Sequence, residues 1–334
     1  MPFLTCPLLK AASAGDVETL ITLIEQGSDV NVQDENGWSP LHATMLGMHF
    51  GSGRNYPDQV TCARLLLEAG ADPALKVFGK CDVMNLAVTN RVAALVAMLK
   101  ERGMKILPSC SLLEFIEGWP REWDRRIVEE CREVLQMMLQ ESPDINEKTE
   151  DDRSLTALHI ACSRGHHAAI NDLLAAGADP NICDNDGDSP LAYLANFAWR
   201  SRTDCLESIR ALIRCGADLN LCGNGGHSET ALSWLVKYGG NRLYVITLLL
   251  ESGADPNRAN SKGETPLMFA AQSDRADVLQ TLMMFGADSE LRDEQGMTAL
   301  AHARNNNRQQ AVEVLEKNIG ASRSVIKVEV FSLR

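Results

Sequence analysis

Three clusters of residues have types and spacing that could do chemistry, and the first looks like a calcium site. Residues 184–188 read Asp-Asn-Asp-Gly-Asp, an alternation of carboxylates similar to the start of an EF-hand loop. A loop of that kind ends in a bidentate glutamate at its twelfth position. Ala195 occupies that position here. The segment is therefore predicted to be a hairpin turn and not a calcium site.

The second cluster is rich in glycine, and the third combines histidine with cysteine. Residues 223–226 read Gly-Asn-Gly-Gly but lack the Gly-Lys-Ser/Thr of a phosphate-binding loop, so a longer, flexible turn is expected. Zinc ligands are suggested by a third group, which consists of His159, Cys162, His166 and His167. Each of these has a structural explanation in the repeats described below. We expect no enzyme activity, no metal site and no cofactor.

Composition and charge indicate which kinds of partner the protein is expected to bind and in which compartment it is expected. The chain has 334 residues, with 45 acidic against 32 basic side chains, and its formal net charge is −13. Nucleic-acid binding needs clustered lysine and arginine, so it is not expected. The sequence contains no apolar run of about 18 residues that could cross a membrane, and its start is unlike a signal peptide. Ten scattered cysteines are read as reduced, buried thiols of a cytoplasmic protein.

Internal repetition is the strongest signal in the chain. A string beginning Gly-Ala-Asp recurs at residues 70–72, 177–179, 216–218, 253–255 and 286–288. A second string follows, and reads Ser-Pro-Leu-His at 39–42, Thr-Ala-Leu-His at 156–159, Ser-Pro-Leu at 189–191, Thr-Ala-Leu at 230–232, Thr-Pro-Leu at 265–267 and Thr-Ala-Leu at 298–300. Such a period indicates a stack of similar structural units.

These strings resemble the signature of ankyrin repeats, which are about 33 residues long. The resemblance covers residues 7–323 and is weakest between 81 and 154. It implies an all-α solenoid of about nine helix–turn–helix pairs with projecting β-hairpin fingers. The repeats are expected at residues 7–37, 38–80, 81–109, 110–154, 155–188, 189–229, 230–264, 265–297 and 298–323, followed by a C-terminal tail at 324–334.

Elementary chemistry explains the repeating unit. Serine or threonine before Pro/Ala-Leu caps a helix, and proline is favoured at the first helical position. A glycine after the second apolar run supplies the positive φ that ends the second helix. The expected glycines are Gly27, Gly70, Gly177, Gly216, Gly253 and Gly286. Each unit has an apolar face that a stacked neighbour must cover, so stability is a sum of nearest-neighbour interfaces.

Three repeats are longer than the standard length, and the extra residues are expected between their two helices. They lie near 50–57, 117–123 and 198–202, and contain aromatic residues beside arginines. Such residues are typical of interface anchors. The alternative is that they are surface insertions without a function, which are tolerated because loop closure entropy grows slowly with length.

The resemblance also implies a partner-binding surface, formed by the fingers and the first helices. The finger positions that match it are Glu35, Asn36, Trp38, Asn185, Asp186, Asp188, Glu229, Ser261, Lys262, Glu264, Glu294, Gln295 and Met297. The matching positions at helix ends are Ser163, Arg164, Asn196, Phe197, Lys237, Tyr238, Gln272 and Ser273. Trp199, from the extra residues of the long sixth repeat, is added as a candidate. Trp38 is the best single anchor, because no packing role is expected at its position. A row of acids that are expected to face solvent consists of Asp186, Asp188, Glu229, Glu264 and Glu294. That row favours a basic protein segment as the partner. The alternative is that the acids only solvate the fingers.

A further row follows the position of the signature histidine in successive repeats, and consists of Tyr193, Trp234, Phe269 and His302. It is interpreted as core that packs between repeats. Together these features predict a monomeric, non-enzymatic adaptor that binds a protein. The alternative is a dedicated inhibitor, similar to an antitoxin or immunity protein, or a host-targeting effector that blocks one basic protein.

Overall fold

The computed structural model describes residues 6–46, 57–106, 111–119, 125–141, 144–200, 205–223, 229–240 and 242–318, apart from the side chains of residues 125, 199 and 200. The chain divides into two compact units, Met1–Ile145 and Asn146–Arg334. The described residues are helical apart from turns and loops, and their only β-structure is two isolated bridges, Val77 with Cys81 and Lys148 with Thr156. The fingers in this part of the chain are therefore turns without regular strands.

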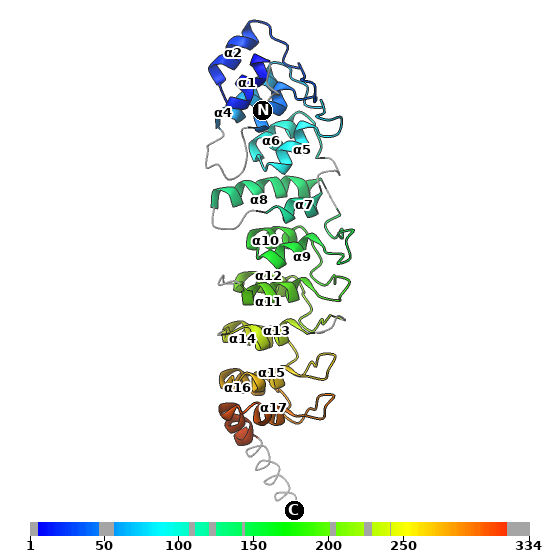
Figure 1. Ribbon diagram of the computed structural model, residues 1–334, viewed down its shortest axis with the longest axis vertical. Helices are drawn as coiled ribbons and strands as arrows, with labels where there is room; N and C mark the ends of the chain where they lie inside the picture. The colour runs from blue at the N-terminus through cyan, green and yellow to red at the C-terminus, as the bar shows by residue number, and fades with distance from the viewer. Residues whose placement is uncertain are drawn as a thin grey trace, which may run out of the picture. The chain divides into compact units, whose positions relative to one another are not determined.

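Helices come in consecutive pairs along both units (Figure 1). The N-terminal unit contains α1 (Pro7–Ala14), α2 (Val17–Glu25), α3 (Pro40–Leu46), α4 (Pro57–Glu68), α5 (Val83–Thr89), α6 (Ala93–Glu101), α7 (Leu112–Glu117) and α8 (Arg125–Gln140). The C-terminal unit contains α9 (Ala157–Arg164), α10 (His167–Ala175), α11 (Pro190–Arg200), α12 (Leu206–Arg214), α13 (Ala231–Tyr238), α14 (Leu243–Glu251), α15 (Pro266–Gln272), α16 (Ala276–Met284), α17 (Ala299–Asn305) and a last helix over residues 309–318. The predicted all-α fold of about nine helix pairs is confirmed.

In the repeats that carry the Ser/Thr-Pro/Ala-Leu string, the first helix begins where the sequence predicts a cap. Thr156 precedes α9, and its hydroxyl accepts a hydrogen bond from the backbone N–H of His159. Thr265 caps α15 in the same way, and Pro266 then occupies the first helical position. A threonine hydroxyl at this place satisfies one of the N–H groups that a helix leaves unpaired at its start.

The second helix ends at a glycine in the left-handed region. Gly253 has a φ of 99°, and the N–H of Ala254 beyond it bonds to the carbonyl of Leu249 at 2.9 Å. Glycine adopts this conformation without the cost that a Cβ would add. All six glycines predicted for this role have positive φ.

Asparagine side chains join several of the repeats to the next one. Asn181 donates from Nδ2 to the carbonyl of Gly216 at 2.9 Å and accepts from the N–H of Asp218 at 2.7 Å. Asn257 forms the same pair of bonds with Gly286 and Asp288. The Gly-Ala-Asp string recurs because it presents this carbonyl and N–H to the preceding repeat.

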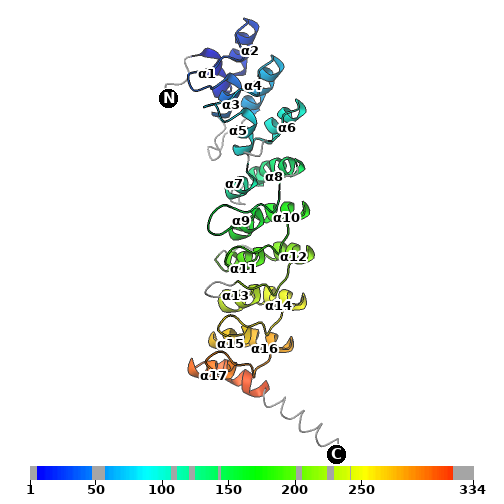
Figure 2. The same cartoon turned by 90° about the vertical axis from the view of Figure 1, so that its right-hand side faces the viewer.

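In the C-terminal unit the core lies between stacked helices and has no single centre. The first helices are in contact in series, α9 with α11, α11 with α13, α13 with α15 and α15 with α17. Figure 2 shows these helices on one side of the stack and α10, α12, α14 and α16 on the other. Leu158, Leu191, Leu232 and Leu267 are at most 1% exposed. Each apolar face is therefore covered by a neighbouring repeat, as the nearest-neighbour argument requires.

The extra residues of the long repeats do not all form loops. Helix α11 continues to Arg200, so the expectation of an inter-helix loop at 198–202 is wrong for its first three residues. Trp119 is only 4% exposed and packs edge-on against Phe115 with ring centroids 5.9 Å apart, so it belongs to the core and is not a surface anchor. Residues 50–56, 120–123 and 201–202, and the tail at 324–334, lie outside the described residues.

Candidate partner-binding surface

Four of the fingers are each organised by one side chain at their base. Asp184 accepts hydrogen bonds at Oδ1 from the N–H groups of Asp186 and Asp188, at 3.0 and 2.8 Å. Its other oxygen, Oδ2, accepts from the hydroxyl of Tyr193 at 2.7 Å. Asp34, Asn260 and Asp293 hold the corresponding N–H groups of their own fingers. Asp184 thus acts as the structural base of a turn.

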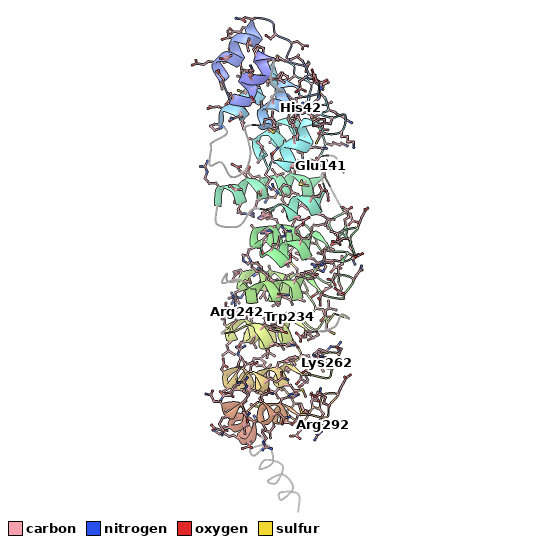
Figure 3. The ribbon with its side chains drawn as sticks, viewed as in Figure 1. His42, Glu141, Trp234, Arg242, Lys262 and Arg292 are labelled. Carbon is pink, nitrogen blue, oxygen red and sulfur yellow. The ribbon has the colours of Figure 1, made fainter. Side chains whose placement is uncertain are left out.

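Adjacent fingers are also joined by backbone bonds, which fix their tips relative to one another. The N–H of Asn185 bonds to the carbonyl of Arg153 at 3.0 Å, and that of Glu294 to the carbonyl of Lys262 at 3.0 Å. Lys262 and Arg292 lie on the finger side of the C-terminal unit, whereas Arg242 lies on the opposite side (Figure 3). The finger side therefore offers a pre-formed row of side chains.

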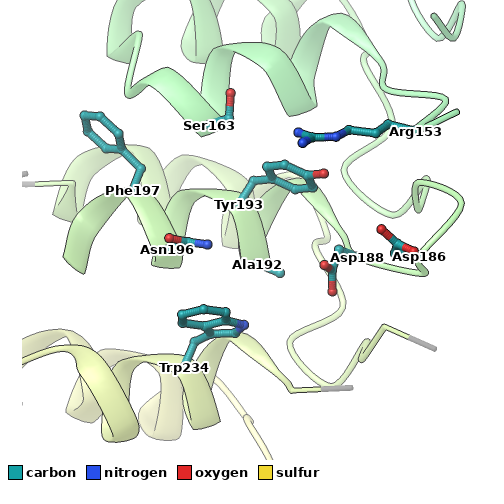
Figure 4. Close-up of a pocket in the computed structure, with 9 residues that line it drawn as sticks. All are labelled: Arg153, Ser163, Asp186, Asp188, Ala192, Tyr193, Asn196, Phe197 and Trp234. Carbon is teal, nitrogen blue, oxygen red and sulfur yellow. The ribbon is translucent and has the colours of Figure 1, made fainter. Parts of the chain in front are cut away.

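A groove of about 500 Å³ opens beside the two fingers that precede α9 and α11 (Figure 4). It is lined by residues of two fingers and of the first helices α9, α11 and α13. These residues are Arg153, Ser163, Asp186, Asp188, Ala192, Tyr193, Asn196, Phe197 and Trp234. Concave sites of this size that combine aromatic walls with a few polar groups are typical of binding sites.

The walls of the groove are aromatic. Tyr193 projects from α11 and Trp234 from α13, and the residues between them in Figure 4 are Ala192 and Asn196. The ring of Trp234 packs against that of Tyr238, with ring centroids 4.6 Å apart. The core interpretation is confirmed for Phe269 and His302, which are 1% and 6% exposed.

The same interpretation is wrong for Tyr193 and Trp234, which are half-buried and line the groove. The ring of Phe197 lies over Gly165, where a Cβ would come within 2.0 Å of it. Gly165 also has a φ of 67°, so this turn accepts only glycine without rearrangement.

Asp188 stands at the finger end of the groove in an unfavourable electrostatic position. Partial burial, followed by the negative charges of Asp184, Asp186 and Glu229, raises its pKa from 3.8 to about 6. Both causes disfavour the charged carboxylate. A positive charge placed in the groove would reverse this effect.

The next repeat contains the same arrangement already occupied by its own cation. Glu229 is 2% exposed, and its Oε1 lies 2.6 Å from the ammonium of Lys237. That ammonium also lies 4.6 Å from the centre of the Phe269 ring. The expectation that the acids of this row face solvent is therefore wrong for Glu229, because the lysine compensates its charge and allows burial.

Comparison with protein families now decides what kind of repeat this is. The model described as "Ankyrin repeats (3 copies)" matches residues 127–221, 158–260, 197–293 and 232–324, and "Ankyrin repeats (many copies)" matches 8–43. The chain belongs to the ankyrin repeat family. Ankyrin repeats are in general protein–protein interaction modules, and the resemblance read from the signature strings is confirmed.

Curated relatives share the repeats at low identity. Rabankyrin-5 of Mus musculus is 26% identical over 178 residues, which is 52% of this chain and 14% of the relative. An ankyrin repeat protein named nuc-2 of Neurospora crassa is 27% identical over 204 residues, 60% of this chain and 17% of the relative. An L-asparaginase of Dirofilaria immitis is 29% identical over 194 residues, 56% of this chain and 28% of the relative. The matched segments span less than a third of these longer proteins.

The remaining predicted positions differ in exposure along the ankyrin array. Fully exposed residues are Glu35, Arg164, Asn185, Asp186, Lys262 and Glu294. Half-buried residues are Asn36, Trp38, Asp188, Phe197, Tyr238, Glu264 and Met297. Trp199 lies in α11, and its side chain is outside those described. Glu35, Asn36 and Trp38 belong to the N-terminal unit and all the others to the C-terminal unit.

Trp38 has a packing role that the sequence did not reveal. Its ring meets His42 edge-on, with centroids 6.2 Å apart and an angle of 81° between the planes. The expectation that this position is free of packing is therefore wrong. The groove residues that sequence reasoning left out of the predicted surface are Arg153, Ala192, Tyr193 and Trp234. Ser163 and Asn196 were among its helix-end positions, and both line the groove.

His159 illustrates the structural role of the signature histidine. Its Nδ1 lies 2.8 Å from the hydroxyl of Thr156, and its Nε2 lies 3.1 Å from the carbonyl of Asp188 in the next finger. Burial lowers its pKa, which favours the neutral ring. Within the described ranges, no three His, Cys, Asp or Glu side chains are grouped to hold a metal ion. No helix among the described residues has the length and apolar character needed to cross a bilayer.

Proposed function

We propose that this ankyrin array is a non-enzymatic module that binds an extended, basic segment of a protein partner. The segment lies along the fingers and the first helices α9, α11 and α13. The groove beside Asp188 is the observation that carries this proposal, because it combines aromatic walls with acidic fingers. Charge complementarity of this kind steers encounter and selects partners.

Further support comes from the rigidity of the surface. The finger tips are joined by the backbone bond from Asn185 to Arg153. The finger bases are joined by the asparagine ladder, the name used here for the bonds from side chains such as Asn181 to the carbonyl and N–H groups of the next repeat. A surface that is already ordered loses little conformational entropy when a partner binds. Most of the conformational entropy lost on binding is therefore lost by the partner's segment.

A peptide selection with the full chain tests this proposal. A library of random peptides displayed on phage is selected against the protein, and enriched sequences are synthesised. A photo-reactive amino acid then replaces Ser163, which lines the groove, or Met284, which is 84% exposed at the end of α16. Enriched peptides are expected to be rich in lysine and arginine and to cross-link from position 163 but not from 284.

Two results would contradict the proposed function. One is a selection that enriches no peptide. The other is cross-linking that is equally strong from both positions, since Met284 belongs to the opposite helix layer.

A further inference from the structure

We propose that the groove between α11 and α13 takes one lysine or arginine side chain of the partner, held between Tyr193 and Trp234 and against Asp188. This inference rests on the proposed function, and it names the contact that contributes most to binding of the partner. It is drawn from a comparison of successive repeats within this chain, in which the same positions are either filled or left open.

The comparison rests on register. The sixth repeat begins its first helix at Pro190 and the seventh at Ala231, each directly after a capping residue. Each finger is counted here with the helix pair that follows it. On that count Asp188 corresponds to Glu229, and Asn196 to Lys237. The ring that closes each site comes from the following repeat, Trp234 for the sixth and Phe269 for the seventh.

The seventh repeat shows what these positions hold when occupied. The Lys237 ammonium contacts the buried Glu229 carboxylate at 2.6 Å and lies against two rings, 4.6 Å from the centre of Phe269 and 5.1 Å from that of Tyr238. A cation that meets a carboxylate and aromatic faces at once is strongly favoured in a partly buried site. Although burial opposes the charged amine, the hydrogen bond to Glu229 leaves the pKa of Lys237 above its ordinary value.

The eighth repeat fills the same positions with an amide. Gln272 donates from Nε2 to Glu264 at 3.5 Å, and the same nitrogen lies 3.2 Å from Nδ1 of His302, which belongs to the following repeat. A hydrogen-bond donor thus bridges the finger acid and the next ring in this repeat as well.

The sixth repeat keeps the acid and the rings but has lost the cation. Asn196 is uncharged and shorter than lysine, and the space beside it is the groove of about 500 Å³. Ala192 is small and deepens the site between the two rings (Figure 4). The missing element is a long cationic side chain, which a partner can supply.

The charges around the groove agree with this occupant. Asp184 and Asp186 on the same finger, and Glu229 before α13, all act on Asp188 to disfavour a negative charge there. His159 of α9 faces the Asp188 carbonyl as a neutral ring. Arg153 also lines the groove, and Figure 4 places it toward Tyr193, on the side away from Trp234. A cation beside Asp188 is therefore attracted by Asp188, Asp184 and Asp186, whereas Glu229 is already paired with Lys237. The guanidinium of arginine can also stack on the aromatic walls.

Nuclear magnetic resonance with small probes tests the site in the full chain. The indole N–H signals of the five tryptophans are recorded, and the Trp234 signal is assigned with Trp234→Phe. The protein is titrated with N-acetyl-arginine amide and with N-acetyl-citrulline amide, which has the same shape without the charge. The arginine probe is expected to shift the Trp234 signal in a saturable way, with at least tenfold weaker binding of citrulline.

Two matched variants then distinguish the groove from a general acidic surface. Asn196→Lys places the cation of the seventh repeat into the sixth, so it is expected to reduce arginine binding at least tenfold in a folded protein. Asn196→Ala changes the same position without adding a charge or a hydrogen-bond donor and is expected to leave binding within about threefold. A folded Asn196→Lys protein is recognised by unchanged shifts of amides in α15 and α16.

Equal binding of arginine and citrulline probes would overturn the inference, as would normal arginine binding by Asn196→Lys. Neither result touches the proposed function, because peptides can still bind along the fingers and cross-link from position 163. Conversely, absence of any peptide binding together with saturable arginine binding would reject the proposed function and leave a cation site.

Discussion

The ammonium of Lys237 lies 2.6 Å from the carboxylate of Glu229, whose side chain is 1% exposed. This pair joins the start of one ankyrin repeat's first helix to the end of the same helix. Removing one partner from a buried ion pair leaves an uncompensated charge, which is more costly than the pair itself is favourable.

Lys237→Met is therefore expected to lower the free energy of unfolding by about 2 to 3 kcal/mol. The lysine is partly exposed, so the loss lies below that of a fully buried pair. Urea denaturation followed by circular dichroism measures it. The double variant Glu229→Gln, Lys237→Met should recover most of the loss, and equal destabilisation in both proteins would show that the pairing is not the cause.

Asp188 is expected to make stability depend on pH in the direction opposite to a salt-bridged aspartate. Its pKa is about 6 in the folded protein against 3.8 as its ordinary value, so the folded state binds the proton more tightly. Its contribution to stability is fully present below pH 4 and is lost as the pH rises through 6. A shift of this size corresponds to about 3 kcal/mol, which we reduce to about 1 kcal/mol because the side chain is half exposed.

Asp188→Asn should consequently be more stable than the parent by about 1 kcal/mol at pH 7.5 and equally stable at pH 4. Urea midpoints at the two pH values test this. The same variant is expected to bind the arginine probe more weakly, so weaker binding would not reflect loss of structure. A stability difference that is the same at both pH values would contradict the assigned titration.

The asparagine ladder is expected to contribute measurable stability between repeats. Asn181→Ala removes two hydrogen bonds to the next repeat, at 2.9 and 2.7 Å, and should cost about 1 to 2 kcal/mol. The same variant should show faster hydrogen exchange at the Asp218 amide, because that N–H loses its acceptor. Glu207→Ala, which breaks an exposed pair with Arg210 inside α12, is the control and should change stability by about 0.5 kcal/mol or less. Unchanged exchange at Asp218 would rule out the ladder as a source of stability.

Trp119 is expected to behave as a core residue of the N-terminal unit. Trp119→Ala should lower the free energy of unfolding by about 3 kcal/mol or more, because a large buried side chain is lost and a cavity remains. Trp119→Phe keeps most of the apolar volume and should cost about half as much or less. Fluorescence-monitored urea denaturation measures both. A loss of less than about 1 kcal/mol for Trp119→Ala would contradict the assignment of this residue to the core.

The repeating physics of the fold could be predicted from the sequence, because each of its signals is local. A threonine before Ala-Leu, as at Thr156, caps a helix wherever the chain goes next. A glycine such as Gly253 ends the second helix through its own φ. These signals gave the all-α ankyrin fold, the number of helix pairs and the finger side as the candidate surface.

Tertiary structure alone decided which of those surface positions are available to a partner. Glu229 and Asp188 occupy equivalent places in their repeats, yet the first is buried because Lys237 reaches it and the second lines an open groove because Asn196 is too short. Tyr193 and Phe269 likewise share a position, and only the packing of the next repeat leaves one half exposed and the other buried. Burial depends on the distance between side chains from different repeats, and a linear period does not contain that distance.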